Sequence, residues 1–344
     1  MSGMPAPSAL APEPDPALAR WIRRELAADP PKVPSLIVTV WGDALVPHGG
    51  AAWLATLIRL LGELSVNERA VRTGIFRVAR DGWLAAEPVG RRSRYRLTTD
   101  AGPRFARAFH RVYDAPFEPW DGEWEAVVAH GEHLGPAARR HLRDELAWAG
   151  FAAFAPGLHL RPARGDGAAL RIVESLGLER FVTAFGARDT ADAVLPTLAS
   201  RDETVYALDA LAADYRRFIA RHAGVVAAFR LRTNPDPAQA FAIRTLLVHA
   251  YRRVRLRDPQ LPREVLPADW PGAQAYMLCR DFYRMAQPMA EAHLAAAFAD
   301  EGDRLPPLDP GFHRRFTLPL EDASTGAAGS APREAPHGGA RRRA

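Results

Sequence analysis

The chain has 344 residues, 48% of them hydrophobic, and a formal net charge of +5. These values exclude a chain that is disordered throughout, and they allow two or three domains that each bury a core. The single cysteine, Cys279, excludes an internal disulfide and any metal site built from several cysteines, and it favours a reducing compartment.

Both ends of the chain have compositions typical of segments without a core. Residues 1–32 begin with a proline- and alanine-rich stretch, and residues 318–344 are rich in Gly, Ala and Pro. We predict a flexible N-terminal extension and a disordered tail. The first residues contain no apolar core after a basic start, and no segment reaches the ~18 uninterrupted apolar residues of a membrane span. We therefore expect a cytoplasmic protein with no membrane partner.

Residues 35–64 predict two apolar helices. The segments "SLIVTVWGDALV" (35–46) and "AAWLATLIRLLGEL" (51–64) are separated by "PHGG", a combination that breaks helices. A third helix follows, because Ser65 with Glu68 three residues later matches a capping box. This motif predicts that the third helix begins near Val66.

The third helix has one apolar side and one cationic side. At 100° per residue its apolar residues share one stripe, and the opposite residues occupy an arc of roughly 140°. The stripe contains Val71, Ile75 and Val78, and the arc contains Arg69, Arg72, Thr73, Arg77 and Arg80. A solvated amphipathic face is the alternative interpretation of such a helix taken by itself.

A basic β-hairpin is predicted next, because two strand-like runs between Leu84 and Leu97 flank "GRRS" at 90–93. Residues 65–97 contain eight arginines and three acidic residues, so their excess charge of +5 equals that of the whole chain. Two helices, a basic helix and a basic hairpin is the order of a winged helix-turn-helix. Such an excess of arginine would neutralise DNA phosphates. We predict a DNA-binding domain at 33–97.

The middle of the chain predicts a ferredoxin-like domain at 119–190, after a linker helix at 98–118 that Thr98 can cap. Its elements are expected as strand 124–129, helix 137–150, a strand pair within 151–162, helix 169–178 and strand 180–186. The segment "HGEH" (130–133) has neither the spacing nor the neighbours of a metal site. No Walker A loop, GxGxxG fingerprint or GxSxG elbow occurs, so we predict no metal, no cofactor and no enzyme.

The pattern becomes almost entirely helical towards the C-terminus, which predicts a helical effector and dimerisation domain at 191–317 and an α+β fold overall. Within it, a helix carries His249, Arg252 and Arg253, and a proline-rich loop leads to Trp270. Guanidinium groups beside an aromatic loop would suit an anionic, partly apolar ligand. Packing and surface roles are the alternative for these four residues.

Four segments carry a family resemblance: "SLIVTVWGDALVPHGGAAWLATLIRLL", "LSVNERAVRTGIFRVARDGWLAAEPVGRRSRYRLTTDAG", "WDGEW" and "LLVHAYRRVRLRDPQLPREVLPADWPGAQA". Along roughly residues 33–300 the chain resembles the PaaX-like transcriptional repressors, which regulate phenylacetate degradation. The resemblance implies an N-terminal winged helix, a middle ferredoxin-like domain of the Cas2 type and a helical C-terminal domain. It also implies a homodimer that binds operator DNA and is released by phenylacetyl-CoA.

The resemblance also implies site residues. From the match "NERAVRT", the candidates for the recognition helix are Asn67, Arg69, Arg72, Thr73 and Arg77, and the cationic arc of the helix adds Arg80. From the match "GRRSRYRL", the candidates for the wing are Arg91, Arg92, Ser93 and Arg94. We place a CoA-thioester effector in the C-terminal part, with candidates His249, Arg252, Arg253 and Trp270. Gly74 departs from the alanine expected there, and glycine costs a helix about 1 kcal/mol.

Two other functions stay open at this stage. The chain could be a DNA-binding or architectural protein without a small-molecule effector. A Cas2-like metal-dependent nuclease is the remote alternative, but this chemistry needs acidic metal ligands, and the first strand of the middle domain offers only Glu123 and Glu125.

Overall fold

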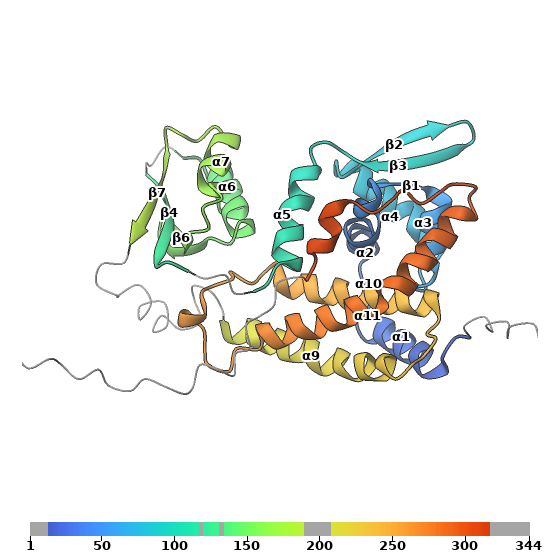
Figure 1. Cartoon of the computed structure of the whole chain (residues 1–344). Coiled ribbons are helices and arrows are strands. Elements are labelled where there is room, and N and C mark those ends of the chain that lie inside the picture. Colours follow the sequence, from blue (N-terminus) through green and yellow to red (C-terminus); the bar gives the residue numbers. More distant parts are fainter. Residues whose placement is uncertain (1–12, 117–119, 131–133, 189–207, 317–344) are drawn as a thin grey trace, which may run out of the picture.

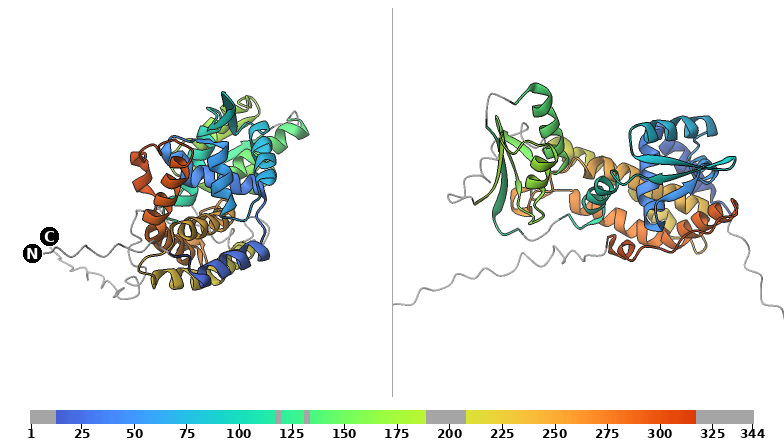
Figure 2. Two further views of the ribbon diagram at one scale, coloured as in Figure 1. Left: turned by 90° about the vertical axis from the view of Figure 1, so that its right-hand side faces the viewer. Right: turned by 90° about the horizontal axis from the view of Figure 1, so that it is seen from above.

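The computed structural model describes residues 13–116, 120–130, 134–188 and 208–316 (Figure 1). The described elements form an N-terminal unit of helices and a small sheet, a central four-stranded sheet with two helices, and a set of long helices from the C-terminal part. Figure 2 shows that the central sheet lies at the opposite end of the molecule from the β2–β3 hairpin of the N-terminal unit. No helix among the described residues is both long and apolar enough to cross a lipid bilayer.

The N-terminal unit contains three helices and a three-stranded antiparallel sheet in the order β1-β3-β2. Its elements are α2 (Val33–Val40), the π-helical turn η1 (Trp41–Leu45), the 3-10 turn η2 (Val46–His48), β1 (Ala51–Trp53), α3 (Leu54–Gly62), α4 (Glu68–Arg80), β2 (Leu84–Val89) and β3 (Arg92–Leu97). Gly49 and Gly50 have φ angles of 84° and 66°, so glycine ends the first helical run as predicted. The predicted helix at 51–64 begins three residues later, because β1 pairs with β3.

The predicted capping box at Ser65 is wrong. Ser65 has a φ of 57°, in the left-handed region, whereas the residue that caps a helix start is extended. Helix α4 begins at Glu68, and Asn67 caps it, because its side-chain oxygen accepts a hydrogen bond from the N–H of Ala70 at 2.9 Å. Asn67 therefore has a structural role at the start of the predicted recognition helix.

Gly74 is explained by the close approach of α4 to α2. A Cβ atom built on Gly74 would lie 2.6 Å from Cδ1 of Ile37 and 2.8 Å from Cγ1 of Val33. A larger residue would force the side chains of Ile37 and Val33 to shift, so this contact favours glycine despite the ~1 kcal/mol that it costs a helix. Gly74 thus allows α4 to pack closely on α2.

Helix α5 (Gly102–Tyr113) follows the N-terminal unit. It begins later than predicted. The hydroxyl of Thr98 accepts a hydrogen bond from the N–H of Ala101, so Thr98 stabilises the turn before the helix instead of capping it.

The central region has the predicted ferredoxin-like order of elements. They are β4 (Glu123–Ala129), α6 (Pro136–Trp148), β5 (Ala152–Ala155), β6 (Leu158–Pro162), α7 (Ala168–Ser175) and β7 (Val182–Arg188). The four strands are antiparallel in the order β5-β6-β4-β7. Val127, Val173 and Leu146 contribute to a core between one face of the sheet and the two helices. This region has its own core.

The C-terminal part contributes three long helices, α9 (Leu208–Arg230), α10 (Pro237–Arg255) and α11 (Gly272–Ala299), and two short turns, η3 (Arg263–Val265) and η4 (Pro310–Arg314). The buried side chains of these helices and of the N-terminal unit form one continuous hydrophobic core. Helix α10 is enclosed, because it packs against the N-terminal helix α1 (Pro16–Ala28) and against α2, α5, α9 and α11.

The prediction of a flexible segment over the whole of residues 1–32 is wrong. Helix α1 (Pro16–Ala28) begins at the cap Asp15 and packs on α9 and α10. Leu18, Trp21 and Ile22 are buried there, and the rings of Trp21 and His222 meet edge to face. Burial of these apolar side chains offsets the entropy that ordering the segment costs. Residues 1–12 and the predicted tail at 318–344 lie outside the described residues.

Candidate nucleic-acid interface

Helix α4 presents one packed face and one exposed face, as its sequence predicts. Val71, Gly74, Ile75 and Val78 are buried. The exposed face consists of Arg69, Arg72, Thr73, Phe76, Arg77 and Arg80, with Asn67 exposed just before the helix. Phe76 is 66% exposed. The structure thus brings all six predicted residues of this segment to one surface.

The arginines of α4 have little acid nearby. Arg72 pairs with Glu68 one turn earlier at 2.7 Å, and Arg80 lies 3.6 Å from Asp81. All four of these side chains are more than half exposed, and such pairs contribute little to stability. Within the described part of the chain, neither Arg69 nor Arg77 forms an ion pair. The face keeps a net positive charge that is available to a partner.

The predicted wing is the β2–β3 hairpin, which turns at Gly90 with a φ of 60°. Arg91 is exposed at its tip. Ser93 and Arg94 are half-buried in β3, and Arg94 lies 5.8 Å from the centre of the Trp53 ring. The four wing candidates therefore do not form one free surface.

Arg92 of the predicted wing is held by the residues that directly follow α11. Its guanidinium lies 4.3 Å from the centre of the Trp53 ring and donates to the carboxylate of Glu301 at 2.6 Å. Asp303 accepts a hydrogen bond from Trp53 at 2.9 Å, and Asp300 pairs with Arg59 of α3. We call Asp300, Glu301 and Asp303 the acidic end of α11. It connects the hairpin to the C-terminal helices.

The four effector candidates do not line one common cavity, although His249, Arg252 and Arg253 are neighbours on α10. His249 shares a hydrogen bond of 2.7 Å with Thr39 of α2, and burial together with the neighbouring arginines lowers its pKa to about 3. Arg253 pairs with Asp29 at 2.8 Å. Trp270 packs edge to face on Tyr215. Each of these contacts is one that a packing or surface residue makes.

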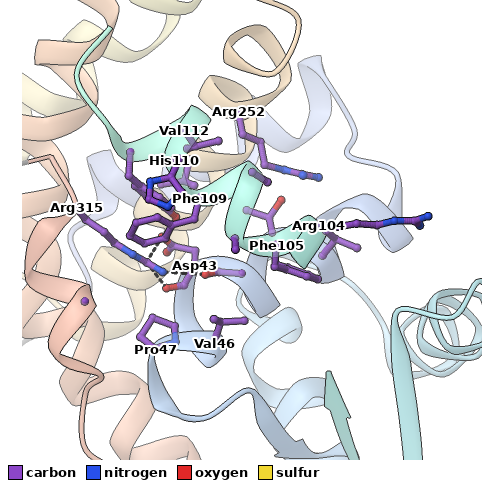
Figure 3. Close-up of a pocket in the computed structure, with 18 of the residues that line it drawn as sticks. Asp43, Val46, Pro47, Arg104, Phe105, Phe109, His110, Val112, Arg252 and Arg315 are labelled. Carbon is purple, nitrogen blue, oxygen red and sulfur yellow. Dashed lines mark hydrogen bonds and ion pairs between the residues drawn. The ribbon is translucent and has the colours of Figure 1, made fainter. Parts of the chain in front are cut away.

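Arg252 alone among the four lines the open cavity of about 480 Å³ between the N-terminal unit, α5, α10 and η4 (Figure 3). Its guanidinium donates to the backbone and side-chain oxygens of Ser35 in α2, at 2.9 and 2.8 Å. Sequence reasoning missed the other walls of this cavity, because they come from segments far apart in the chain.

The acidic residues of the central sheet are neutralised by arginine. Glu125 pairs with Arg161 at 2.5 Å and accepts a hydrogen bond from the N–H of Ala169, and Glu123 pairs with Arg188 at 3.0 Å. The described residues contain no group of three or more His, Cys, Asp or Glu side chains placed to hold a metal ion. Of the "HGEH" segment only His130 lies in the described part, and it shares a hydrogen bond with Thr183.

Three family models match consecutive parts of the chain. They describe a PaaX-like protein (residues 32–101), the PaaX protein central Cas2-like domain (117–199) and the PaaX-like protein C-terminal domain (206–296). The transcriptional repressor PaaX of Escherichia coli (strain K12) is 34% identical over 301 residues, which cover 87% of this chain and 94% of that protein. The chain belongs to the PaaX family.

Membership of the PaaX family confirms the resemblance, the α+β fold and the Cas2-like type of the central domain. It also makes this chain a transcription regulator and not an enzyme. A solved structure, the uncharacterized protein Rv0674 from Mycobacterium tuberculosis, is 24% identical with a TM-score of 0.45, covering 76% of this chain and 97% of that one. This likeness is too distant to add to the assignment.

Proposed function

We propose that this chain is a DNA-binding repressor of an operon for the breakdown of phenylacetate or a related acyl-CoA compound. It would act in the cytoplasm as a homodimer, and phenylacetyl-CoA or a related CoA thioester would release it from its operator. The repressor named among its relatives supports the proposal. The observation that carries it is the exposed cationic face of α4, whose arginines have few acidic partners.

Helix α4 would enter the major groove as the recognition helix of a winged helix-turn-helix. Arginine reads guanine through two hydrogen bonds, which suits Arg72 and Arg77 on the exposed face. Phe76, exposed among these arginines, would contact a thymine methyl group. Arg91 at the tip of the hairpin would contact phosphate.

The effector would act through the geometry of the dimer. Two recognition helices must lie about 34–36 Å apart, or a multiple of this, to enter successive major grooves. A modest rotation of one protomer against the other would break this register without unfolding either of them. An effector can favour the rotated state only by binding it more tightly.

The DNA-binding half of the proposal is tested with operator DNA obtained by in vitro selection from a random library with the full-length protein. Arg69→Ala/Arg77→Ala should weaken binding to the selected duplex at least tenfold in fluorescence anisotropy. The control is Arg140→Ala/Arg217→Ala, which removes two exposed arginines from α6 and α9. Equal affinity of the first double variant and the control for DNA would refute α4 as the contact surface.

The effector half is tested by titrating phenylacetyl-CoA, and CoA as the control, into the protein bound to its selected duplex. Release by phenylacetyl-CoA at concentrations where CoA has no effect is the expected result. If no CoA ester changes the affinity for DNA, the protein is a DNA-binding regulator without a small-molecule effector, which is the second candidate.

A further inference from the structure

The cavity between α5, the N-terminal unit and α10 has the size and lining of a small-molecule site. Its volume of about 480 Å³ lies within the range of ligand pockets, roughly 300–1,000 Å³. Its apolar wall includes Val46, Phe105, Phe109, Val112 and Phe312. In Figure 3 Phe105, Phe109 and Val112 of α5 lie close to Arg252 and to the Arg315–Asp43 pair, with Val46 and Pro47 below Asp43. An aromatic group would be well accommodated by this wall.

Arg252 is a half-buried cation without a carboxylate partner among the described residues. Its contacts are with the neutral oxygens of Ser35, and its buried Nε atom has no hydrogen-bond partner there. Partial burial lowers its pKa to about 10, with a further lowering by Arg253. A partly desolvated guanidinium that lacks a counter-charge favours an incoming anion or carbonyl oxygen.

The other arginines around the cavity differ from Arg252. Arg315 donates to Asp43 and to the hydroxyl of Tyr283, so its charge is already paired within the protein. Arg104 is exposed at the rim, 5.7 Å from the centre of the Trp83 ring. The cavity therefore has an uncompensated cation inside and another at its mouth.

We propose that this cavity binds the aryl-acyl group of the effector, with the ring against Phe105 and Phe109 and the acyl oxygen on Arg252. Arg104 at the rim would meet the negative charge of a CoA moiety outside the cavity. The shared chemistry is an aryl-acyl group with an oxygen acceptor, which both a CoA thioester and the free carboxylate possess. The inference deepens the effector half of the proposed function and rests on it.

The position of the cavity would couple a ligand to the DNA-binding face. Arg252 holds α2 through Ser35, and Gly74 fixes α4 closely against α2. A ligand oxygen that draws the guanidinium away from Ser35 would free α2, and α4 would move with it. The ligand then stabilises a state in which the recognition helix is displaced.

The test is isothermal titration calorimetry of phenylacetyl-CoA, phenylacetate and CoA with the full-length protein. Arg252→Gln should weaken binding of phenylacetyl-CoA at least tenfold. Its neighbour Arg253, which pairs with Asp29 outside the cavity, supplies the matched control, and Arg253→Gln should change the affinity less than twofold. Ala108→Phe narrows the cavity from α5 without touching a charge, and should also weaken binding at least tenfold.

The outcomes separate the site from the proposed function. If the wild type binds phenylacetyl-CoA and both cavity variants bind it equally well, the site is wrong while the effector half stands. If only phenylacetate binds, with the same dependence on Arg252, the site is right and the effector is the free acid. If the wild type binds none of the three compounds, the site and the effector half both fail, and the DNA measurements still report on the repressor.

Discussion

Helices α4 and α10 carry four arginines each, but their guanidinium groups have different surroundings. In α4 all four are exposed, and Arg69 and Arg77 form no ion pair with a described residue. In α10 Arg244 and Arg255 are buried and paired with carboxylates, Arg253 pairs at the surface, and Arg252 is bound to neutral oxygens of α2.

The number of packed faces explains this difference. Helix α4 packs on α2, α3 and β2 and leaves one face exposed, whereas α10 is enclosed by helices from both ends of the chain. A guanidinium on an enclosed helix must find partners within the protein, since an unpaired buried charge is costly. A cluster of arginines therefore indicates a DNA-binding surface only where one face of the helix remains open.

The largest expected effect is on stability, from Arg244. Its guanidinium is fully buried between Asp43 and Glu291, at 3.1 and 3.0 Å. Arg244→Ala would remove the cation that these two carboxylates share, leaving Asp43 only Arg315 and Glu291 only His48 among the described residues, and should lower the free energy of unfolding by about 3–5 kcal/mol. Urea denaturation measures this loss of stability. Arg77→Ala on the open face of α4 should stay within about 0.5 kcal/mol of wild type, and similar losses in the two variants would contradict the comparison.

The second prediction concerns DNA discrimination by α4. Arg72→Ala or Arg77→Ala should weaken binding to the operator more than to random DNA, by ~1–3 kcal/mol, because a bidentate contact with guanine is lost. Competition anisotropy with specific and random duplexes measures the difference. Equal losses on both duplexes would reduce these arginines to phosphate contacts.

The third prediction uses His249 on the enclosed helix. Burial lowers its pKa to about 3, below the ordinary 6.5, so the folded state holds it neutral. The unfolded chain takes up a proton as the pH falls through 6.5, and the folded state does so only near 3. Because of His249, the free energy of unfolding should therefore fall by about 1 kcal/mol when the pH is lowered from 7.5 to 5.5. Urea denaturation at both pH values should show a smaller loss for His249→Asn, and an equal loss would refute this role.

The smallest expected effect is a difference in the salt dependence of DNA binding between variants of Arg91 and Arg92 in the β2–β3 hairpin. Arg91→Ala should lower the slope of log affinity against log salt by about one, as for one lost phosphate contact. Arg92 is held by Glu301 and Trp53, so Arg92→Ala should change the slope less. Titrations at several salt concentrations measure both slopes. Equal changes would show that Arg92 leaves the acidic end of α11 when the protein binds DNA.

The elements that can be predicted from the sequence are those whose signals are local. The apolar stripe of α4, the turn at Gly90 and the order of strands and helices in the central domain all depend on residues a few positions apart. The exposed face of α4 follows from the same periodicity. The predicted start of α4 was wrong although its signal is local, because Asn67 caps the helix and Ser65 adopts a left-handed conformation.

Which arginines stay available to a partner depends on how the helices pack together in the folded chain. Arg92 and Glu301 meet across 209 positions, and Arg252 and Ser35 across 217. No local pattern contains such pairs, because they depend on which helices pack together and on the burial that packing imposes. The order of α1 and the cavity at Arg252 have the same origin, since each is formed by segments that meet only after the chain has folded.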